Sequence, residues 1–112
     1  MKPPRLNRQL TLEAPLRVAD GSGGWIESWQ PLGKVWAQIT ARSGREISPE
    51  RVPVSRVNYN ILVRAAPHGA PDRPAPEQRF SEGKRHFHIR AVIENDADAR
   101  YLTCIATEET AV

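Results

Sequence analysis

Apolar and polar residues alternate with a period of two over much of this chain, and that pattern most constrains its fold. One face of residues 56–64 holds Val57, Tyr59, Ile61 and Val63. Residues 85–93 repeat the pattern, with a predicted inner face of Phe87, Ile89, Ala91 and Ile93 and an outer face of His86, His88 and Arg90. Because successive side chains of a β strand point to opposite sides, the alternation predicts two half-buried strands.

Shorter segments of the same character extend the prediction to an all-β chain. Further strands are expected at residues 8–14, 25–30, 34–41, 79–80 and 101–107. Pro31 should interrupt the sheet, because a central strand does not tolerate proline. The nearest helix candidate, 43–52, contains Pro49 and is followed by Pro53, which limits it to about one turn. The sequence therefore predicts a small β-barrel or sandwich of about six strands.

Glycine and Asx residues mark the turns between these strands. Residues 20–24 read Asp-Gly-Ser-Gly-Gly and predict a hairpin tip. A phosphate-binding loop of similar composition would be followed by a helix, whereas a strand is expected to begin here at Trp25. Residues 81–84 contain Gly83 and predict a second hairpin, and residues 95–98 predict an Asx-rich turn.

The length and composition fit one small domain, residues 1–112, with a thin core. Leu, Ile, Val and Phe make up about a fifth of the chain, close to the ~20% floor for foldable sequences. The single cysteine, Cys104, excludes an internal disulfide framework and fits a reducing compartment. No apolar run approaches the ~18 residues of a membrane span, and no signal peptide opens the sequence. We expect a soluble, intracellular protein.

The net charge of +3 is unevenly distributed along the chain. Residues 1–64 carry ten basic and five acidic residues, for +5, whereas residues 65–112 carry six basic and eight acidic residues, for −2. Thirteen of the sixteen basic residues are Arg, whose planar guanidinium binds oxyanions in a bidentate manner. This balance permits contacts with nucleic acid but does not require them.

A proline-rich segment, residues 65–78, separates two of the predicted strands. Its prolines are Pro67, Pro71, Pro74 and Pro76. Extended polyproline geometry would let it reach roughly 40 Å, farther than the ~13 Å radius of gyration of such a domain. Two interpretations remain open: an arm that lies on a neighbouring subunit, or a mobile surface loop.

The residues that could carry chemistry do not form a site. His86 and His88 share one strand face, but no further ligand is placed to complete a metal site, so a solvent-facing pair is favoured. Cys104 lies between Leu102 and Ala106 on an apolar face, which indicates an inert core thiol. No catalytic residues, metal or cofactor are predicted, and the chain is not expected to be an enzyme.

Three tryptophans, Trp25, Trp29 and Trp36, leave several interpretations open. They can be base-stacking platforms on a small barrel. In a thin core, tryptophan is more often the core itself or an interface anchor.

The order of several short motifs indicates a family. The series runs from residues 5–13 (RLNRQLTLE) and 20–25 (DGSGGW) to 35–39 (VWAQI), 43–46 (SGRE), 64–67 (RAAP), 79–80 (RF), 87–89 (FHI) and 100–104 (RYLTC). In this order the motifs resemble the phage head–tail joining family, also called head–tail adaptor or head-closure stopper proteins. The sequence is most similar to the version carried by gene transfer agents.

The resemblance implies a structural role without enzymatic activity. Members of this family are small β-barrels that form a ring, a hexamer or dodecamer, in the neck of the particle. The implied partners are further copies of the chain, a portal-adaptor protein on the head side, a tail terminator or tail tube protein on the tail side, and the packaged double-stranded DNA. The implied location is the neck of a particle assembled in the bacterial cytoplasm.

Two segments are candidate functional elements under this resemblance. Residues 43–53 match a loop that lines or plugs the channel in some members, and four arginines surround it, namely Arg42, Arg45, Arg51 and Arg56. These could supply countercharge to DNA phosphates. The proline-rich arm is expected to contact a neighbouring subunit through Pro67, Pro71, Arg73, Pro74 and Pro76.

A function of another class stays open as the alternative: a monomeric barrel that binds single-stranded nucleic acid. It predicts an affinity for DNA that falls steeply with salt. The acidic C-terminal stretch and the lack of a basic-aromatic stripe favour the structural interpretation.

Overall fold

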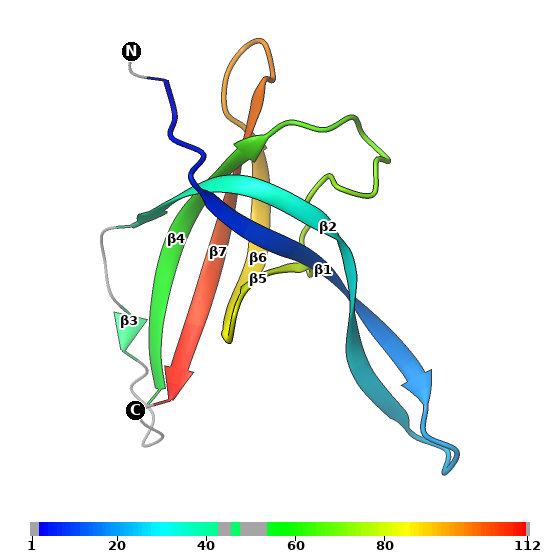
Figure 1. Ribbon diagram of the computed structural model, residues 1–112. Coiled ribbons are helices and arrows are strands. Elements are labelled where there is room, and N and C mark those ends of the chain that lie inside the picture. Colours follow the sequence, from blue (N-terminus) through cyan, green and yellow to red (C-terminus); the bar gives the residue numbers. More distant parts are fainter. Residues whose placement is uncertain (1–2, 43–45, 48–53, 112) are drawn as a thin grey trace.

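The computed structural model is a single sheet of antiparallel strands, and it describes residues 3–42, 46–47 and 54–111 (Figure 1). The strands are β1 (Arg8–Ala19), β2 (Trp25–Ala41), β3 (Glu46–Ile47), β4 (Val54–Arg64), β5 (Arg79–Glu82), β6 (Arg85–Glu94) and β7 (Tyr101–Ala111). These described residues contain no helix long and apolar enough to cross a membrane. The predicted all-β class is confirmed.

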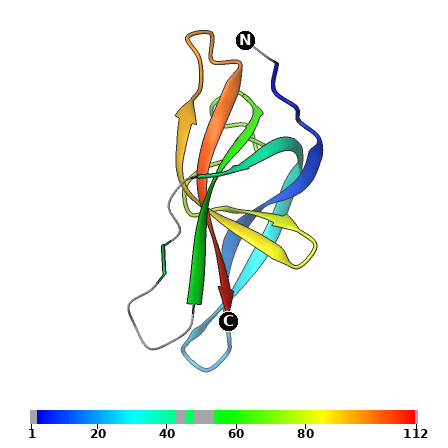
Figure 2. The ribbon, with the colours of Figure 1, turned by 90° about the vertical axis from the view of Figure 1, so that its left-hand side faces the viewer.

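The sheet closes on itself into a barrel-like ring. Its strand order is β2-β1-β5-β6-β7-β4-β3, and β2 also pairs with β4. That closing pairing joins residues 37–41 to residues 59–63. Six strands therefore surround one interior, and the short β3 adds to the edge of β4 (Figures 1 and 2). Closure removes the unpaired edges of the barrel, which would otherwise be templates for aggregation.

The core fills the inside of this ring with residues from all six strands. The buried apolar residues are Leu10, Leu12, Ala37, Ile61, Val63, Phe80, Phe87, Ile89, Leu102, Cys104 and Ala106. Burial of each large side chain stabilises the fold by about 1.5–3 kcal/mol. Tyr59 packs edge-on against Phe87 at 5.3 Å between ring centroids. The predicted position of Cys104 in the core is confirmed.

A β-bulge in β6 changes which side chains face the core. The register with β7 shifts between Ile89 and Ala91, so that Val92 pairs with Cys104 and Ile93 pairs with Thr103. Val92 packs against the core, whereas Ile93 is 49% exposed. The predicted inner positions of Ala91 and Ile93 are therefore wrong, because one extra residue reverses the alternation beyond it.

β1 and β2 continue past the barrel as a two-stranded ribbon, which projects at the lower right of Figure 1. Pro15 pairs with Trp29 there, and Pro31 pairs with Glu13. The expected interruption at Pro31 is wrong, since β2 runs through it with a register shift at that point. In the described chain both prolines lie where their strand has a neighbour on one side only, and an edge position tolerates the missing N–H donor.

The ribbon ends in the predicted hairpin tip. The Asp20 carboxylate accepts hydrogen bonds from the backbone N–H groups of Ser22 (2.8 Å) and Gly24 (3.0 Å). Gly21 and Gly23 have φ angles of +82° and +83°, which glycine adopts without strain. The turns at Gly83 and at residues 95–98 are also present as expected.

Candidate functional site

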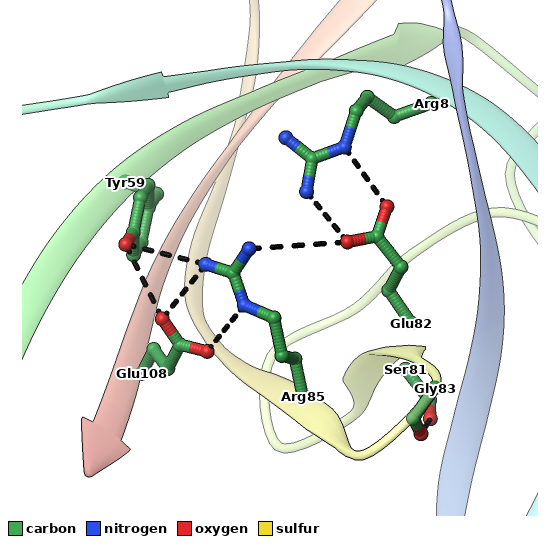
Figure 3. Close-up of polar contacts among 7 residues, drawn as sticks. All are labelled: Arg8, Tyr59, Ser81, Glu82, Gly83, Arg85 and Glu108. Carbon is green, nitrogen blue, oxygen red and sulfur yellow. Dashed lines mark hydrogen bonds and ion pairs between the residues drawn. The ribbon is translucent and has the colours of Figure 1, made fainter.

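A cluster of charged residues closes one end of the barrel interior (Figure 3). Each member occupies the next inward position after the buried residues of its strand, and the five members are Arg8, Tyr59, Glu82, Arg85 and Glu108. This mouth cluster carries two positive and two negative charges, so it is electrically balanced. It replaces apolar packing where the barrel opens to solvent.

Two carboxylates organise the mouth cluster. The Arg8 guanidinium donates to Glu82, with an Nε–Oε2 distance of 2.8 Å, and Arg85 Nη1 lies 3.9 Å from Oε1 of the same carboxylate. Arg85 donates two hydrogen bonds to Glu108, at 2.8 and 2.9 Å. The Tyr59 hydroxyl also donates to Glu108, at 3.2 Å. The cluster thus connects β1, β4, β6, β7 and the end of β5 through side chains.

The ionisation of the cluster follows from these contacts. The hydrogen bond from Arg85 lowers the pKa of Glu108, and the hydrogen bond from Arg8 lowers the pKa of Glu82. Burial, together with the neighbouring Glu108 charge, raises the pKa of Tyr59. Both carboxylates are therefore held ionised, and their charges balance those of the two guanidiniums. This arrangement suits a structural role, in which side chains hold strands together, rather than proton transfer.

On the outer face of the barrel, side chains of β1, β2, β5 and β6 form a second set of contacts that anchors the projecting ribbon. Arg79 donates to Glu13 at 2.7 Å, and its guanidinium lies 4.1 Å from the Trp29 ring centroid. His88, the cross-strand neighbour of Arg79, meets Trp29 edge-on at 6.0 Å. The ribbon base is therefore fastened to the barrel by a cation–π contact and an ion pair with side chains only 16–17% exposed.

The histidines face outward as predicted but are half-buried rather than solvated. Burial lowers the pKa of His88, and the Nδ1 atom of His86 is buried without a hydrogen-bond partner among the described residues. No group of three or more metal-ligating side chains occurs within the described ranges. Cys104 is fully buried, and burial raises the pKa of its thiol to about 12, as expected for an unreactive core residue.

The four arginines of the predicted channel loop are only partly placed. Arg45 and Arg51, like most of residues 43–53, lie outside the described residues. Arg42 is exposed at the end of β2, where its N–H donates to the carbonyl of Asn58 (2.9 Å). Arg56 is also exposed, and its guanidinium pairs with Glu109 at 2.8 Å. Within the described residues Arg42 forms no ion pair, whereas Arg56 shares its charge with a carboxylate.

The proline-rich arm, residues 65–78, folds back on its own barrel. Backbone hydrogen bonds form turns from Ala70 to Pro67, from Arg73 to Ala70 and from Gln78 to Ala75. The Arg73 guanidinium donates to the Ala66 carbonyl at 2.7 Å, and Pro74 is buried. The expectation of an extended polyproline reach is therefore wrong, since these turns shorten the segment. Three of its prolines remain exposed, namely Pro67, Pro71 and Pro76.

The tryptophans do not form the core. Trp25 is 64% exposed near the ribbon tip, and Trp36 is 54% exposed on the outer face of the barrel. Trp36 lines a groove of about 470 Å³ together with Pro4, Leu6, Arg64 and Tyr101. The ribbon adds Leu16, Val18 and Ile26, which are 44–57% exposed. An isolated chain thus presents large apolar side chains at two separate places, as interface anchors do.

Comparison with known proteins identifies the family. The family model for phage head completion proteins matches residues 1–109. The chain belongs to this family. A search of curated proteins finds no significant match. Among solved structures, a chain from the virion of a native gene transfer agent particle is 54% identical, with a TM-score of 0.86. The match covers 98% of this chain and 100% of that one.

Membership of the head completion family confirms the resemblance drawn from the motifs, including its likeness to the gene transfer agent version. It also bears on how the exposed tryptophans and the mouth cluster are interpreted. A head completion protein is a part of a particle, so exposed tryptophans and a barrel closed by a balanced charge cluster fit contacts with other proteins better than catalysis.

The groove and the mouth cluster were not predicted from the sequence. The cluster has a signal: Arg8, Glu82, Arg85 and Glu108 each continue the alternation of an apolar face by one step. The groove has none, because its lining comes from the N-terminal segment and from three strands distant in sequence.

Proposed function

We propose that this chain is a ring-forming head-closure protein in the neck of a phage-like particle of the gene transfer agent type. The observation that carries the proposal is the full-length match to a virion chain at 54% identity, joined to the family match over residues 1–109. In this role it connects a portal-adaptor protein to a tail terminator or tail tube protein and retains the packaged DNA.

The surface of the isolated barrel supports assembly. Large apolar side chains are exposed on both the ribbon and the barrel, and each gains burial only from a neighbour. The pairs Arg8–Glu82, Glu13–Arg79 and Arg56–Glu109 join the basic first half of the chain to its acidic second half. Two of these pairs match a base of the first half with an acid of the second, and Glu13–Arg79 matches them in the opposite sense, so most of the charge asymmetry remains available for contacts with neighbours.

The DNA-facing element in this proposal is the segment 43–53 with Arg42, Arg45, Arg51 and Arg56. β2 and β4 lead into and out of this segment, so a ring that points these strand ends inward would present it to the channel. Arginine charges there would attract phosphates without reading sequence. The exposed prolines of the arm, Pro67, Pro71 and Pro76, are proposed to touch a neighbouring subunit.

The experiment is deletion of the gene in a producing strain, followed by electron microscopy and by measurement of nuclease-protected DNA. We expect heads without tails, or heads that lose their DNA, with recovery when the full chain is supplied in trans. Particles that keep both tail and DNA without this chain would contradict the proposal.

A separate test addresses DNA contact. Substitution of Arg42, Arg45 and Arg51 by Gln should leave tails attached but reduce nuclease-protected DNA, with Lys84→Gln as a control at an exposed turn. The single-stranded DNA alternative predicts instead that the purified monomer binds oligonucleotides with strong salt dependence. The positions of Trp25 and Trp36 argue against a continuous stacking row, since eleven residues of strand place them roughly 35 Å apart.

A further inference from the structure

We propose that the ribbon tip of one copy of this chain docks into the outer groove of a neighbouring copy, with Trp25 seated beside Trp36 and Glu27 paired with Arg64. This inference rests on the proposed assembly of several copies and names the surfaces that make the contact. It concerns two features that the fold of a single chain leaves unused.

The projecting ribbon has the properties of a knob. In the described chain, its strands pair only with each other from Ala14 to the tip, and side chains on both of its faces are exposed. Trp25 and Glu27 share one face, because alternate residues of a strand point the same way. A two-stranded ribbon that exposes this much apolar surface is only marginally stable without a cover.

The groove has the properties of a matching hole. It lies between the N-terminal segment and the outer face of β2, β4 and β7, where the N–H of Arg5 donates to Gln38 Oε1 at 2.8 Å. A second hollow of about 580 Å³ continues it, because both are lined by Pro4 and Tyr101. Its walls are the Trp36 and Tyr101 rings and apolar parts of the N-terminal segment. An indole is a suitable occupant for such a slot.

The charges of the two surfaces are complementary. The ribbon carries Asp20 and Glu27 against Arg17, for a net −1. The groove contributes Arg64, and the hollow that continues it contributes Arg5, Arg100 and Asp96, for a net +2 over the two together. Arg100 is already paired with Asp96 at 3.0 Å, whereas Glu27 and Arg64 make no ion pair within the described residues. Pairing Glu27 with Arg64 would therefore satisfy two available groups.

The placement of knob and hole selects the partner. Both views of the ribbon diagram put the hairpin tip at the opposite end of the molecule from the N-terminal segment (Figures 1 and 2). The longest dimension of the chain is 53 Å, so the tip cannot reach its own groove. A contact between unlike ends of identical copies is heterologous, and such contacts form closed rings when the rotation between copies closes.

The test is a charge reversal in full-length protein within the producing strain. Glu27→Arg alone and Arg64→Glu alone each place like charges in contact, and each should reduce DNA-filled, tailed particles at least about tenfold. The double variant restores the pair in reverse and should return particle yield to within about twofold of the wild type. Lys84→Glu is the matched control and should leave yield unchanged, because Lys84 is exposed in the β5–β6 turn away from both surfaces.

Thermal melts of the purified variants separate folding from docking. Both substituted residues are exposed, so each variant should keep the wild-type melting temperature. Wild-type yield in both single variants would overturn the docking contact while the deletion result still stood for head closure. A defect in Glu27→Arg that Arg64→Glu neither shares nor rescues would also overturn it and would assign the ribbon to a different virion protein.

Discussion

Glu108 shows how a single charged residue can stabilise a barrel at its open end. Its carboxylate accepts hydrogen bonds from Arg85 on β6 and from Tyr59 on β4, so it holds two neighbouring strands to β7. Apolar side chains could fill the same space, but they would be exposed to water at the mouth. A balanced cluster is compatible with solvent on one side and core on the other.

Glu108→Gln should destabilise the fold by about 1 kcal/mol at pH 7, because a charged acceptor is exchanged for a neutral one and partial solvent exposure weakens the loss. The pKa of Glu108 is lower in the folded chain than its ordinary 4.5. Its contribution is therefore fully present above pH 4.5 and is lost as pH falls through the folded pKa. Urea unfolding at several pH values should show the wild type and variant converging in acid.

The control for this measurement is Glu27→Gln, since Glu27 is exposed and makes no ion pair within the described residues. It should leave stability at pH 7 unchanged. If Glu108→Gln matches this control at every pH, the mouth cluster contributes nothing to stability.

Trp29 sets the environment of His88. Burial is the main cause that lowers the pKa of His88 below 6.5, and the Trp29 ring lies against it. Trp29→Ala should therefore raise the pKa of His88 toward 6.5, as measured by NMR titration of the imidazole. Trp25→Ala is the matched control, since Trp25 is exposed at the far end of the ribbon, and it should leave the pKa of His88 unchanged. An unchanged pKa of His88 in Trp29→Ala would mean that the ribbon does not cover the imidazole.

At the scale of elements, the strands were predictable and their irregularities were not. Alternation correctly located the cores of β4, β6 and β7, because burial of one face leaves a direct record in the sequence. The bulge after Ile89 left no such record, and Ile93 was therefore placed on the wrong face. The strands β1 and β2 were predicted too short, because the first prediction stopped before Pro15 and the second was interrupted at Pro31. A strand tolerates proline where one of its edges has no neighbour, and the sequence does not show which edges are free.

The candidate site was less predictable than the fold for the same reason. Arg42 and Arg56 were identified as arginines that surround segment 43–53, and neither their charge nor their place in the sequence tells whether a carboxylate such as Glu109 lies beside them. The arm was expected to extend because its prolines favour extended geometry locally. Turns and the buried Pro74 prevail instead, as the arm gains contacts by lying on its own barrel.

The turn between β6 and β7 offers a test of backbone strain. Ala99 has a φ of +52°, a left-handed conformation that costs an L-residue with a side chain about 1–2 kcal/mol. Ala99→Gly should therefore raise the free energy of unfolding by about 0.5–1 kcal/mol, after the greater backbone entropy of glycine is subtracted. Ala97→Gly in the same turn lacks a positive φ and should be neutral or destabilising. Chemical denaturation of the two variants decides, and equal effects would contradict this account.

At the scale of the whole molecule, closure of the ring makes stability a shared property of the six barrel strands. β7 pairs with β4 on one side and with β6 on the other, and Cys104 lies at its centre opposite Ile61 and Val92. No short stretch of backbone can open to expose this thiol without breaking both pairings. Its accessibility should therefore report the opening of the entire barrel.

Labelling of Cys104 by a thiol reagent should accordingly follow global unfolding. The native thiol is protected twice, by burial and by a pKa raised to about 12, which keeps it protonated at pH 8. Leu102→Ala removes a buried side chain and costs about 2–5 kcal/mol, so labelling should accelerate by at least about tenfold. Ile93→Ala, at an exposed position, should leave the rate unchanged. If Leu102→Ala lowered stability but not protection, Cys104 would be reached by local opening, and the idea that the barrel opens as one cooperative unit would be wrong.

In assembled particles, contacts made only by the folded chain stabilise it further, and labelling of Cys104 should be slower than in the free protein.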